Sequence, residues 1–513
     1  MAQRPRRFHF VLLALLCLIV AAYSVFTWEM VDLPWLSGAK GQDLAHLRRH
    51  NESSGHGNAT ATGADDVTRL PNATLELHAT GPVDVTRLPS SSPVLHTTTG
   101  NNATTATPPY DLFGNVVHLN NLNEACFHAN DSIVHWSYNS TEVDLAQLWT
   151  RDETPRNELI AHLAQCPEVD VFLPAGLRDH GYCEDGMAYV KFLKTRALPL
   201  WVFDLRFDYQ GRKNINYFDL CPNTALLFMN HYTEGLMDRD DFPSDKVVVN
   251  MPNVEMYELK GKDYHRFDVV LCKTRDGYDR LSRWYKDNGN PRNTKLLYVQ
   301  HTSSDPSTVA ITHAMAHPEL PPIQPKNFEN LTFFHANGHS WFKSTRAVLE
   351  KLVDSRAFHQ IFGDDGAPSN LQFHHGEEVD VAQFGRQLLE TSAILCPSRM
   401  EGFGHYINQA RASGSLVLTT NAPPMNEFID NDSGVLVEAS TRDQLLSAYG
   451  GMEWHVSWHS ICDAVDNVLH LAPSERQRRA QNGRQRYEKQ LIEFRDNMHD
   501  VRALLAKKPQ QEI

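Results

Sequence analysis

Short apolar runs recur along the chain from Tyr110 onward, and segments with helical periodicity lie between them. This alternation predicts an α/β fold with parallel sheets covered by helices, because strands buried on both faces are apolar throughout. Strands of a first sheet are predicted at residues 169–173, 198–203, 225–229, 246–249 and 268–271, with 296–299 either closing the sheet or leading out of it. Strands of a second sheet are predicted at residues 331–335, 359–362, 371–373, 393–396, 416–419 and 434–437.

The two series of strands predict two Rossmann-like domains. A chain of 513 residues is too long to fold around a single hydrophobic core, since domains usually contain roughly 100 to 200 residues. We expect an N-terminal domain at 110–316 and a C-terminal domain at 326–472, with the Pro-rich stretch 317–325 as the hinge. Residues 473–513 are predicted to form an arginine-rich helical segment, which we interpret as a solvated helix packed by one face rather than as a ligand site.

The N-terminus carries three arginines and then an uncharged run from Phe10 to Phe26, followed by Trp28. A bilayer span needs roughly 20 apolar residues, and positive charge holds its flank on the cytoplasmic side. We expect a cytoplasmic tail at 1–9 and a transmembrane anchor at 10–28 in a single-pass type II protein of the Golgi or endoplasmic reticulum, with the chain behind the anchor lumenal. A cleaved signal peptide is the alternative, although no Ala-x-Ala site follows the run.

Residues 29–109 are rich in Thr, Ser, Asn, Gly and Pro. So few large apolar side chains cannot offset the entropy of ordering, which predicts a disordered, glycosylated stem. The hexapeptide at 66–71 returns at 84–89, but two copies without a core do not make a solenoid. Asn-x-Ser/Thr acceptors, which mark lumenal chains when they cluster, begin at Asn51, Asn58, Asn72, Asn102, Asn130, Asn139, Asn330 and Asn431.

Seven cysteines follow the predicted anchor, so at least one has no partner within the chain. Cys272 and Cys396 lie in apolar strand-like runs and are predicted to be core thiols. The other five cysteines are available for disulfides in an oxidising lumen, but the sequence does not determine their connectivity. They are Cys126, Cys166, Cys183, Cys221 and Cys462. The absence of a Cys-x-x-Cys pair argues against a structural zinc site.

The net charge of −14 argues against a general binder of nucleic acid or anionic membranes, because such partners require a basic surface. Any phosphate-bearing ligand must then be held by a local site.

The segment 393–427 is the most informative part of the chain. It reads as a buried strand, a loop that contains Gly402 and Gly404, a helix ended by Gly414, and a second buried strand. Glycines at a strand-to-helix turn let backbone amides approach a ligand, and a helix start offers unpaired N–H groups at the positive end of its dipole. The segment therefore predicts an anion cradle, although any tight connection also uses glycine.

The stretch Pro-Ser-Arg-Met-Glu-Gly-Phe-Gly at 397–404 resembles the donor-binding region of the retaining nucleotide-sugar glycosyltransferases with the B-type fold. That family includes sucrose synthase and many mannosyl- and glucosyltransferases. The resemblance implies that Glu401 contacts hydroxyls of the transferred sugar and that the donor is bound by Gly402, Phe403 and Gly404. The family's second glutamate, which holds the ribose, is replaced here by Gln409, whose amide can hydrogen-bond but carries no charge.

A second piece of the resemblance lies upstream, around Gly338. The family has an arginine just after this glycine and a lysine further on, both on the donor diphosphate; His339 and Lys343 stand at these places. Gly376 falls where the family's base-binding loop begins. His231 follows a predicted strand where the family has residues facing the reacting sugar, and we favour a structural histidine there over an acceptor-side role.

The resemblance implies a glycosyltransferase, most simply a hexosyltransferase. It would move a sugar from a nucleotide-sugar donor to a glycan, glycoprotein or glycolipid acceptor, with retention of configuration and with no metal or cofactor. Lys343 and Glu401 would be the catalytic residues, with Lys343 and the amides near Gly404 stabilising the departing diphosphate.

Two rival interpretations remain. A metal-dependent A-type glycosyltransferase needs an Asp-x-Asp behind a strand; residues 238–240 and 430–432 have that spacing, but both look like turns. A non-catalytic carbohydrate-binding protein of the same fold would accommodate the replacements at His339 and Gln409.

Overall fold

The computed structural model describes nine segments of the chain, at residues 73–78, 111–129, 131–140, 144–255, 261–338, 340–352, 371–375, 379–444 and 452–506. Leu70–Ile513 form one compact unit.

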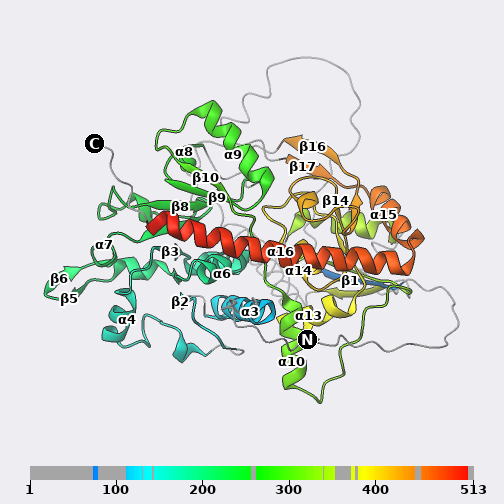
Figure 1. Cartoon of the computed structure of the whole chain (residues 1–513), viewed down its shortest axis with the longest axis horizontal. Helices are drawn as coiled ribbons and strands as arrows, with labels where there is room; N and C mark the ends of the chain where they lie inside the picture. The colour runs from blue at the N-terminus through cyan, green and yellow to red at the C-terminus, as the bar shows by residue number, and fades with distance from the viewer. Residues whose placement is uncertain are drawn as a thin grey trace, which may run out of the picture. The chain divides into compact units, whose positions relative to one another are not determined.

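The first sheet has seven strands in the order β10-β9-β8-β7-β3-β4-β2 (Figure 1). All neighbours are parallel except the edge strand β2. The strands are β2 (Val134–His135), β3 (Val169–Phe172), β4 (Arg196–Leu198), β7 (Ala225–Met229), β8 (Val248–Met251), β9 (Val269–Cys272) and β10 (Lys295–Tyr298). Because β3 is followed by β4 on one side and β7 on the other, the topological switch point lies between β3 and β7, where open α/β sheets bind ligands.

Apolar side chains cover both faces of this sheet. Val171, Leu227 and Leu271 belong to the core beneath α3 (Leu112–His128), α6 (Cys183–Phe192) and α16 (Pro473–Ala506). Their strand neighbours Phe172, Phe228 and Cys272 belong to the core on the opposite face, under α4 (Arg156–Leu163) and α9 (Arg275–Asn288). Burial on both faces explains why the sequence shows continuous apolar runs instead of alternation.

One predicted strand of the first sheet is wrong over most of its length. The strand predicted at 198–203 overlaps β4 only at Leu198, and a 3-10 helix, η3 (Leu200–Asp204), takes the place of the remainder. Pro199 stands between them and has no backbone N–H to continue the ladder, so the strand stops there. The sequence analysis also missed the two-stranded hairpin of β5 (Phe207–Tyr209) and β6 (Arg212–Ile215).

The second sheet has six strands in the order β12-β1-β11-β13-β14-β15. They are β1 (Ala73–His78), β11 (Thr332–Ala336), β12 (Leu371–His375), β13 (Ala393–Cys396), β14 (Leu416–Thr420) and β15 (Val435–Val437). The pairs β11–β13, β13–β14 and β14–β15 are parallel, whereas β1 is antiparallel to both its neighbours. The two parallel sheets confirm the predicted α/β fold class.

Strand β1 corrects the prediction of a disordered stem at six of its residues. The segment Ala73–His78 alternates small or polar residues with leucine, which suits a strand, and it pairs with β11 and β12. The rest of the predicted stem, the anchor at 10–28 and the strand predicted at 359–362 lie outside the described residues. None of the described helices is both long and apolar enough to cross a membrane.

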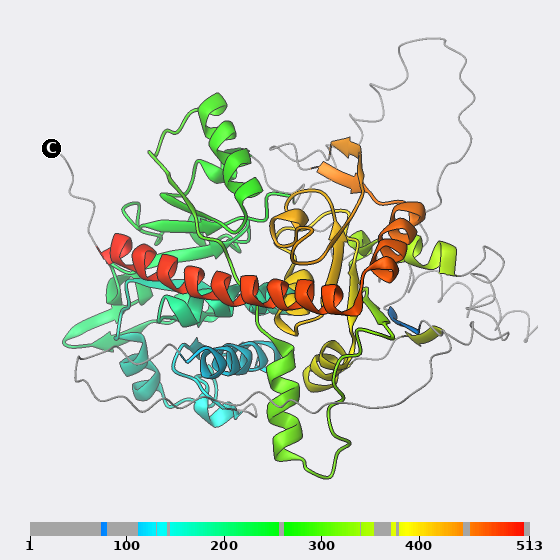
Figure 2. The same ribbon diagram turned by 45° about the vertical axis from the view of Figure 1, so that its right-hand side comes forward.

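The long helix α16 crosses both sheets (Figure 1, Figure 2). Leu491 and Phe494 join the core of the first sheet, whereas Ala480 joins that of the second. Its buried positions recur every three or four residues: Arg476, Ala480, Gly483, Tyr487, Gln490, Leu491, Phe494, Met498 and Val501. This confirms the predicted helix packed by one face, and the helix ties the two sheets together.

The predicted hinge at 317–325 is held against α13 (Val381–Glu390) of the second sheet. Arg386 on that helix donates to the carbonyls of Pro321 and Pro322 at 2.7 and 2.8 Å. The preceding helix α10 (Pro306–Ala316) also packs on α13, so closely that a Cβ at Gly385 would lie 1.9 Å from the Pro306 carbonyl oxygen.

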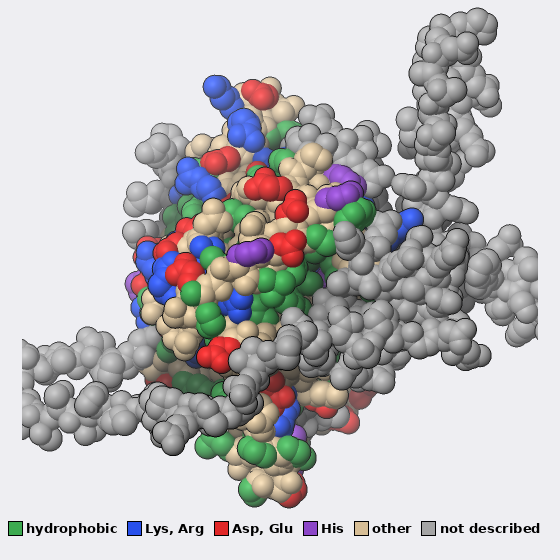
Figure 3. Space-filling model, turned by 90° about the vertical axis from the view of Figure 1, so that its right-hand side faces the viewer, with side chains coloured by type: hydrophobic (Ala, Val, Ile, Leu, Met, Phe, Trp, Pro, Cys, Tyr) green, Lys and Arg blue, Asp and Glu red, His purple; other side chains and the backbone are tan. Residues whose placement is uncertain are grey.

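Two disulfides join Cys126 to Cys183 and Cys166 to Cys221, all around the first sheet. Cys272 and Cys396 are buried thiols, as predicted. The acceptor asparagines at 139, 330 and 431 are exposed. On the face drawn in Figure 3, acidic and basic side chains are interspersed among the described residues.

Candidate functional site

The predicted donor-site residues lie where the strands of both sheets end. Loops after β11, β13 and β14 come from the second sheet, and loops after β8 and β9 come from the first. The carboxyl ends of parallel strands are the usual place for ligands in open α/β sheets.

Lys343 and Glu401 form an ion pair. Lys343 closes the 3-10 helix η5 (Trp341–Lys343) behind β11, and Glu401 stands in the loop behind β13. Lys343 Nζ donates to Glu401 Oε1, with the two side chains only 14% and 12% exposed. The structure thus brings together the two predicted catalytic residues, which are 58 positions apart in the sequence.

Two glycines of the predicted site have backbone conformations that favour glycine. Gly404 has φ 98° and caps the start of α14 (His405–Ala412), a conformation that side chains disfavour. Gly338 likewise has φ 54° behind β11. At Gly402, a Cβ would lie 2.3 Å from Oε1 of Glu255, so glycine lets a loop of the first sheet approach the backbone. The ring of Phe403 is buried.

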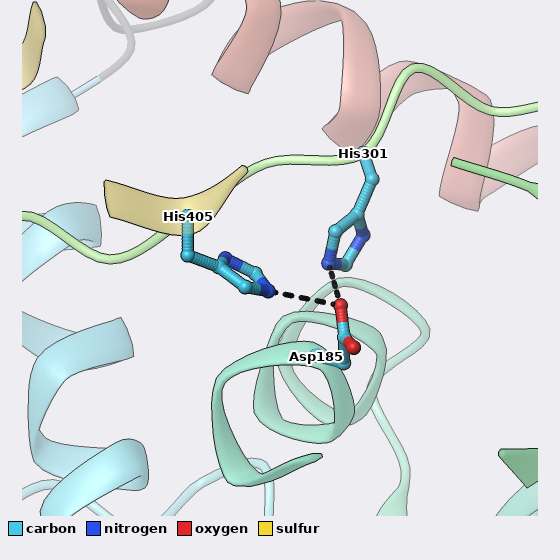
Figure 4. A group of neighbouring side chains, drawn as sticks. All are labelled: Asp185, His301 and His405. Atoms are coloured by element: carbon cyan, nitrogen blue, oxygen red, sulfur yellow. Dashed lines mark hydrogen bonds and ion pairs between the residues drawn. The ribbon is translucent and has the colours of Figure 1, made fainter. Parts of the chain in front are cut away.

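Asp185 is the centre of a charged cluster between the two sheets (Figure 4). Its Oδ1 lies 2.9 Å from Nε2 of His301 and 3.1 Å from Nε2 of His405. Lys273 Nζ donates to both carboxylate oxygens, at 3.0 and 2.9 Å. His405 also contacts Ser303, with 2.8 Å between Nδ1 and Oγ. Since His405 is the first residue of α14, the first sheet holds the helix directly behind the glycine loop.

The charges in this cluster balance one another. Burial alone would raise the pKa of Asp185, but Lys273, His405 and His301 outweigh it and hold that pKa well below its usual value. Burial lowers the pKa of His301 to about 4, so its imidazole is neutral at physiological pH. The central pair is therefore an ionised carboxylate and the Lys273 ammonium.

Asp185, His301 and His405 are also the one group of three metal-ligating side chains found in the described part of the chain, with ligand atoms within 4.8 Å of one another. Lys273, however, already contacts both oxygens of Asp185. A divalent ion would meet that fixed positive charge at short range. We therefore assign the cluster to an ion pair on the first-sheet side, to which His405 joins the second sheet.

Gln409 points toward the first sheet. Its Nε2 donates to Oε1 of Glu184 at 3.4 Å. The same oxygen accepts from the backbone N and the hydroxyl of Ser304, both at 2.6 Å, and Oε2 of Glu184 accepts from Asn123 at 2.9 Å. Predicted as a ribose contact, Gln409 thus takes part in a polar contact between the sheets.

A second carboxylate, Glu427 in η6 (Met425–Glu427), reaches from the second sheet to the start of α9. It accepts from the amides of Arg275 and Asp276 at 2.8 and 2.7 Å. A negative charge at a helix start is favourable because it meets unpaired amides and the positive end of the dipole. Glu427 therefore adds a further link between the two sheets near Glu401.

His339 and Gly376 lie outside the described residues. His231 follows β7 at the expected strand end, where its ring lies 4.2 Å from that of Tyr232.

Sequence reasoning missed Asp185, Lys273, His301 and Glu255. A usable signal existed for Lys273 and His301, since each stands just behind a predicted strand, at 268–271 and 296–299. No such signal marked Asp185 in the sequence, because an acidic residue in the first turn of a helix is usually exposed to solvent.

Neither Asp-x-Asp stretch lies behind a strand. Asp238 pairs with Arg266 at 2.8 Å, and Asp430 and Asp432 pair with arginines of α16 at 2.6 Å. These aspartates belong to surface turns, as the sequence suggested.

No family model matches the chain. Over 119 residues it is 25% identical to the uncharacterized glycosyltransferase 335 of Sulfolobus islandicus rod-shaped virus 1, a stretch that is 22% of this chain and 33% of the viral protein. The chain thus spans about a third of the length of that relative.

Two solved structures are similar at low identity. One is sucrose-phosphate synthase from Thermosynechococcus elongatus, with a TM-score of 0.39 and 12% identity over 61% of this chain and 84% of that chain. Another is Anabaena HepE in complex with UDP-glucose, with a TM-score of 0.35 and 11% identity over 54% and 78%. The chain is thus similar to a glycosyltransferase in part of its sequence, and its donor-site motif resembles that of nucleotide-sugar glycosyltransferases with two Rossmann-like domains.

Proposed function

We propose that the protein is a glycosyltransferase that takes a sugar from a nucleotide-sugar donor. The observation that carries this proposal is the meeting of Lys343 with Glu401 beside the glycine loop at the start of α14. A cation, a carboxylate and a row of free amides are what a sugar diphosphate requires, since phosphate needs positive partners and sugar hydroxyls need acceptors.

In this proposal the donor diphosphate lies against the first amides of α14 and Lys343. The Lys343–Glu401 pair neutralises both charges while the site is empty. When the donor binds, Lys343 turns to the diphosphate and Glu401 accepts from sugar hydroxyls. Negative charge grows on the diphosphate as the bond to the sugar breaks, so Lys343 and the amides stabilise the transition state more than the ground state.

The finer features follow the family resemblance. We propose a hexose as the transferred sugar and a hydroxyl of a glycan, glycoprotein or glycolipid as the acceptor, bound at the first sheet. The acceptor would attack the face that the diphosphate leaves, with retention, and the leaving phosphate would take its proton. Lys343 supplies the positive charge that other enzymes take from a metal, which supports turnover without metal or cofactor.

For its location we propose the Golgi or endoplasmic reticulum membrane, with the apolar run from Phe10 to Phe26 as a type II anchor. The two disulfides support an oxidising compartment, and the exposed asparagines at 139, 330 and 431 are accessible to oligosaccharyl transfer. Expressed in a eukaryotic secretory host, the chain should lose mass on a gel after treatment with an N-glycosidase. An unchanged mass would contradict a lumenal position.

The proposed activity is tested by screening the full-length protein against a panel of nucleotide sugars. A bound donor raises the unfolding temperature, because it stabilises only the folded state. The donor that gives the largest rise is then used to measure release of nucleoside diphosphate in strong chelator. Loss of release in chelator, with rescue by manganese, would favour the metal-dependent rival.

A non-catalytic binding protein is the second candidate, and one observation favours it: Gln409, at the ribose-binding position of the family, is engaged with Glu184. A protein of this kind would bind nucleotide sugars without releasing nucleoside diphosphate, either by transfer or by hydrolysis.

A further inference from the structure

Glu255 reaches from the first sheet into the donor-site loop of the second. It stands in the loop behind β8, and its Oε1 lies so close to Gly402 that a Cβ there would be 2.3 Å away. This carboxyl group of the first sheet therefore lies against the backbone of the residue that follows Glu401.

The other oxygen of this carboxyl group has no partner. Oε2 of Glu255 is buried, and among the described residues nothing hydrogen-bonds to it. Oδ1 of the nearby Asn253 is likewise buried and has no hydrogen-bond partner among the described residues. Buried polar atoms without partners are rare in folded proteins because they lose their bonds to water, and at a functional site they often receive a ligand.

A small cavity joins Glu255 to Glu401. Its walls also include Val254, Met400 and Pro423, and its volume of about 10 Å³ has room for roughly one water molecule. Glu255 and Glu401 thus line one small, partly open space, together with the Asp276–Arg280 ion pair. A sugar ring fits only after the loops at 254–255 and 400–401 have moved apart.

The electrostatics of the cavity suit a neutral, hydroxyl-rich ligand. Burial raises the pKa of Glu255 to about 7; Lys273 opposes this rise, whereas Glu401 and Asp185 add to it. Near neutral pH the group therefore exchanges between the protonated and ionised forms. In either form it can bond a hydroxyl, which both donates and accepts.

We propose that Glu255 is a sugar-binding residue, which contacts a hydroxyl of the transferred sugar from the first sheet while Glu401 contacts others from the second. This inference rests on the proposed function and adds to it a residue that recognises the sugar of the donor and not its nucleotide. A hydroxyl would give Oε2 the partner that it lacks.

The test measures binding of a nucleotide sugar and of the matching free nucleoside diphosphate by calorimetry, for the full-length protein and for Glu255→Gln, Glu255→Met and Glu255→Asp. Glu255→Met keeps the length of the side chain but removes the carboxyl group that hydrogen-bonds. Glu255→Asp keeps the carboxyl group but shortens the side chain by one methylene, which moves the group away from the sugar. Both should weaken the sugar donor about tenfold and leave the free nucleoside diphosphate unchanged. Glu255→Gln should bind the sugar donor nearly as the parent does, because its amide both donates and accepts.

Other outcomes overturn the inference. Equal losses of affinity for the sugar donor and for the free nucleoside diphosphate would make Glu255 a structural residue. Tighter binding of both ligands by the variants would show that the Glu255 side chain obstructs the empty site. If Glu255→Met does not fold, Glu255→Asp decides alone. Glu158→Met on the exposed face of α4 serves as the control. If the parent protein binds neither ligand, the proposed function itself has failed, a result distinct from variants that bind like the parent.

Discussion

At the scale of the residue, two ion pairs lie close to the facing strand ends of the two sheets. Lys343 pairs with Glu401, and Lys273 pairs with Asp185. The sequence predicted the first pair because its members belong to motifs with fixed spacing. It missed the second pair because contacts between residues 88 positions apart leave no local pattern, and it missed Glu255 because that side chain meets Gly402 only where the two sheets face each other.

Glu401→Gln should separate recognition of the sugar from recognition of the nucleotide. The change keeps the shape but removes the charged acceptor for hydroxyls, so affinity for the sugar donor should fall by about tenfold. Affinity for free nucleoside diphosphate should stay nearly the same. Calorimetry with both ligands checks this, with Glu158→Gln as the control. Equal losses for the two ligands would place Glu401 on the nucleotide.

Asp185→Ala should destabilise the protein strongly. The change leaves the Lys273 ammonium buried without a partner, and breaking a buried pair in this way costs about 3 to 5 kcal/mol. Unfolding in urea measures the cost, with Asp279→Ala, which breaks an exposed pair with Arg275, as the control. A loss no larger than that of the control would show that the cluster does not hold the fold.

The contribution of Asp185 should also depend on pH. Because its pKa is lowered in the folded protein, its stabilisation is complete above the unfolded value of about 3.9 and is lost as pH falls toward the lower, folded value. The difference in unfolding free energy between the parent and Asp185→Asn should therefore stay constant from pH 7 to about 5 and shrink below about 4. A difference that shrinks above pH 5 would assign the effect to another group.

At the scale of the element, the sequence predicted most strands of the two sheets within one or two residues, because apolar runs between helical segments are a strong local signal. Pro199 shortened one strand, and β2, β5 and β6 are too short or too polar to predict. Strand β1 lies in a stretch whose composition argues for disorder, yet six alternating residues suffice once a sheet supplies two neighbours.

The contact between α10 and α13 depends on Gly385. A Cβ there would lie 1.9 Å from the backbone oxygen of Pro306, which no side-chain movement relieves. Gly385→Ala must push the two helices apart and should lower the free energy of unfolding by about 1 to 3 kcal/mol. Gly176→Ala, where nothing lies within 4 Å, should change it by less than about 0.5 kcal/mol. Similar urea midpoints for the two variants would contradict the close helix contact.

At the scale of the whole molecule, the described unit is two parallel sheets joined by the hinge stretch, by α16 and by polar contacts across their facing strand ends. Three hydrogen bonds link the second sheet to the first: Glu427 accepts from the start of α9, His405 contacts Asp185, and Gln409 donates to Glu184. Composition and periodicity indicated two sheets but gave no information on how they meet. The sugar-binding proposal depends on that meeting, because Glu255 of the first sheet lies against Gly402, next to Glu401 in the sequence.

The central claim is most directly tested by the rate at which Lys343→Ala releases nucleoside diphosphate in a single turnover, compared with the parent. In the proposed mechanism Lys343 faces the charge that grows on the leaving diphosphate, and removing one such group typically slows the reaction by about 10² to 10³. We therefore predict a loss of that size in the presence of chelator, with a smaller loss of donor affinity. Equal rates for Lys343→Ala and the parent would contradict the account, because the leaving group would then be stabilised elsewhere.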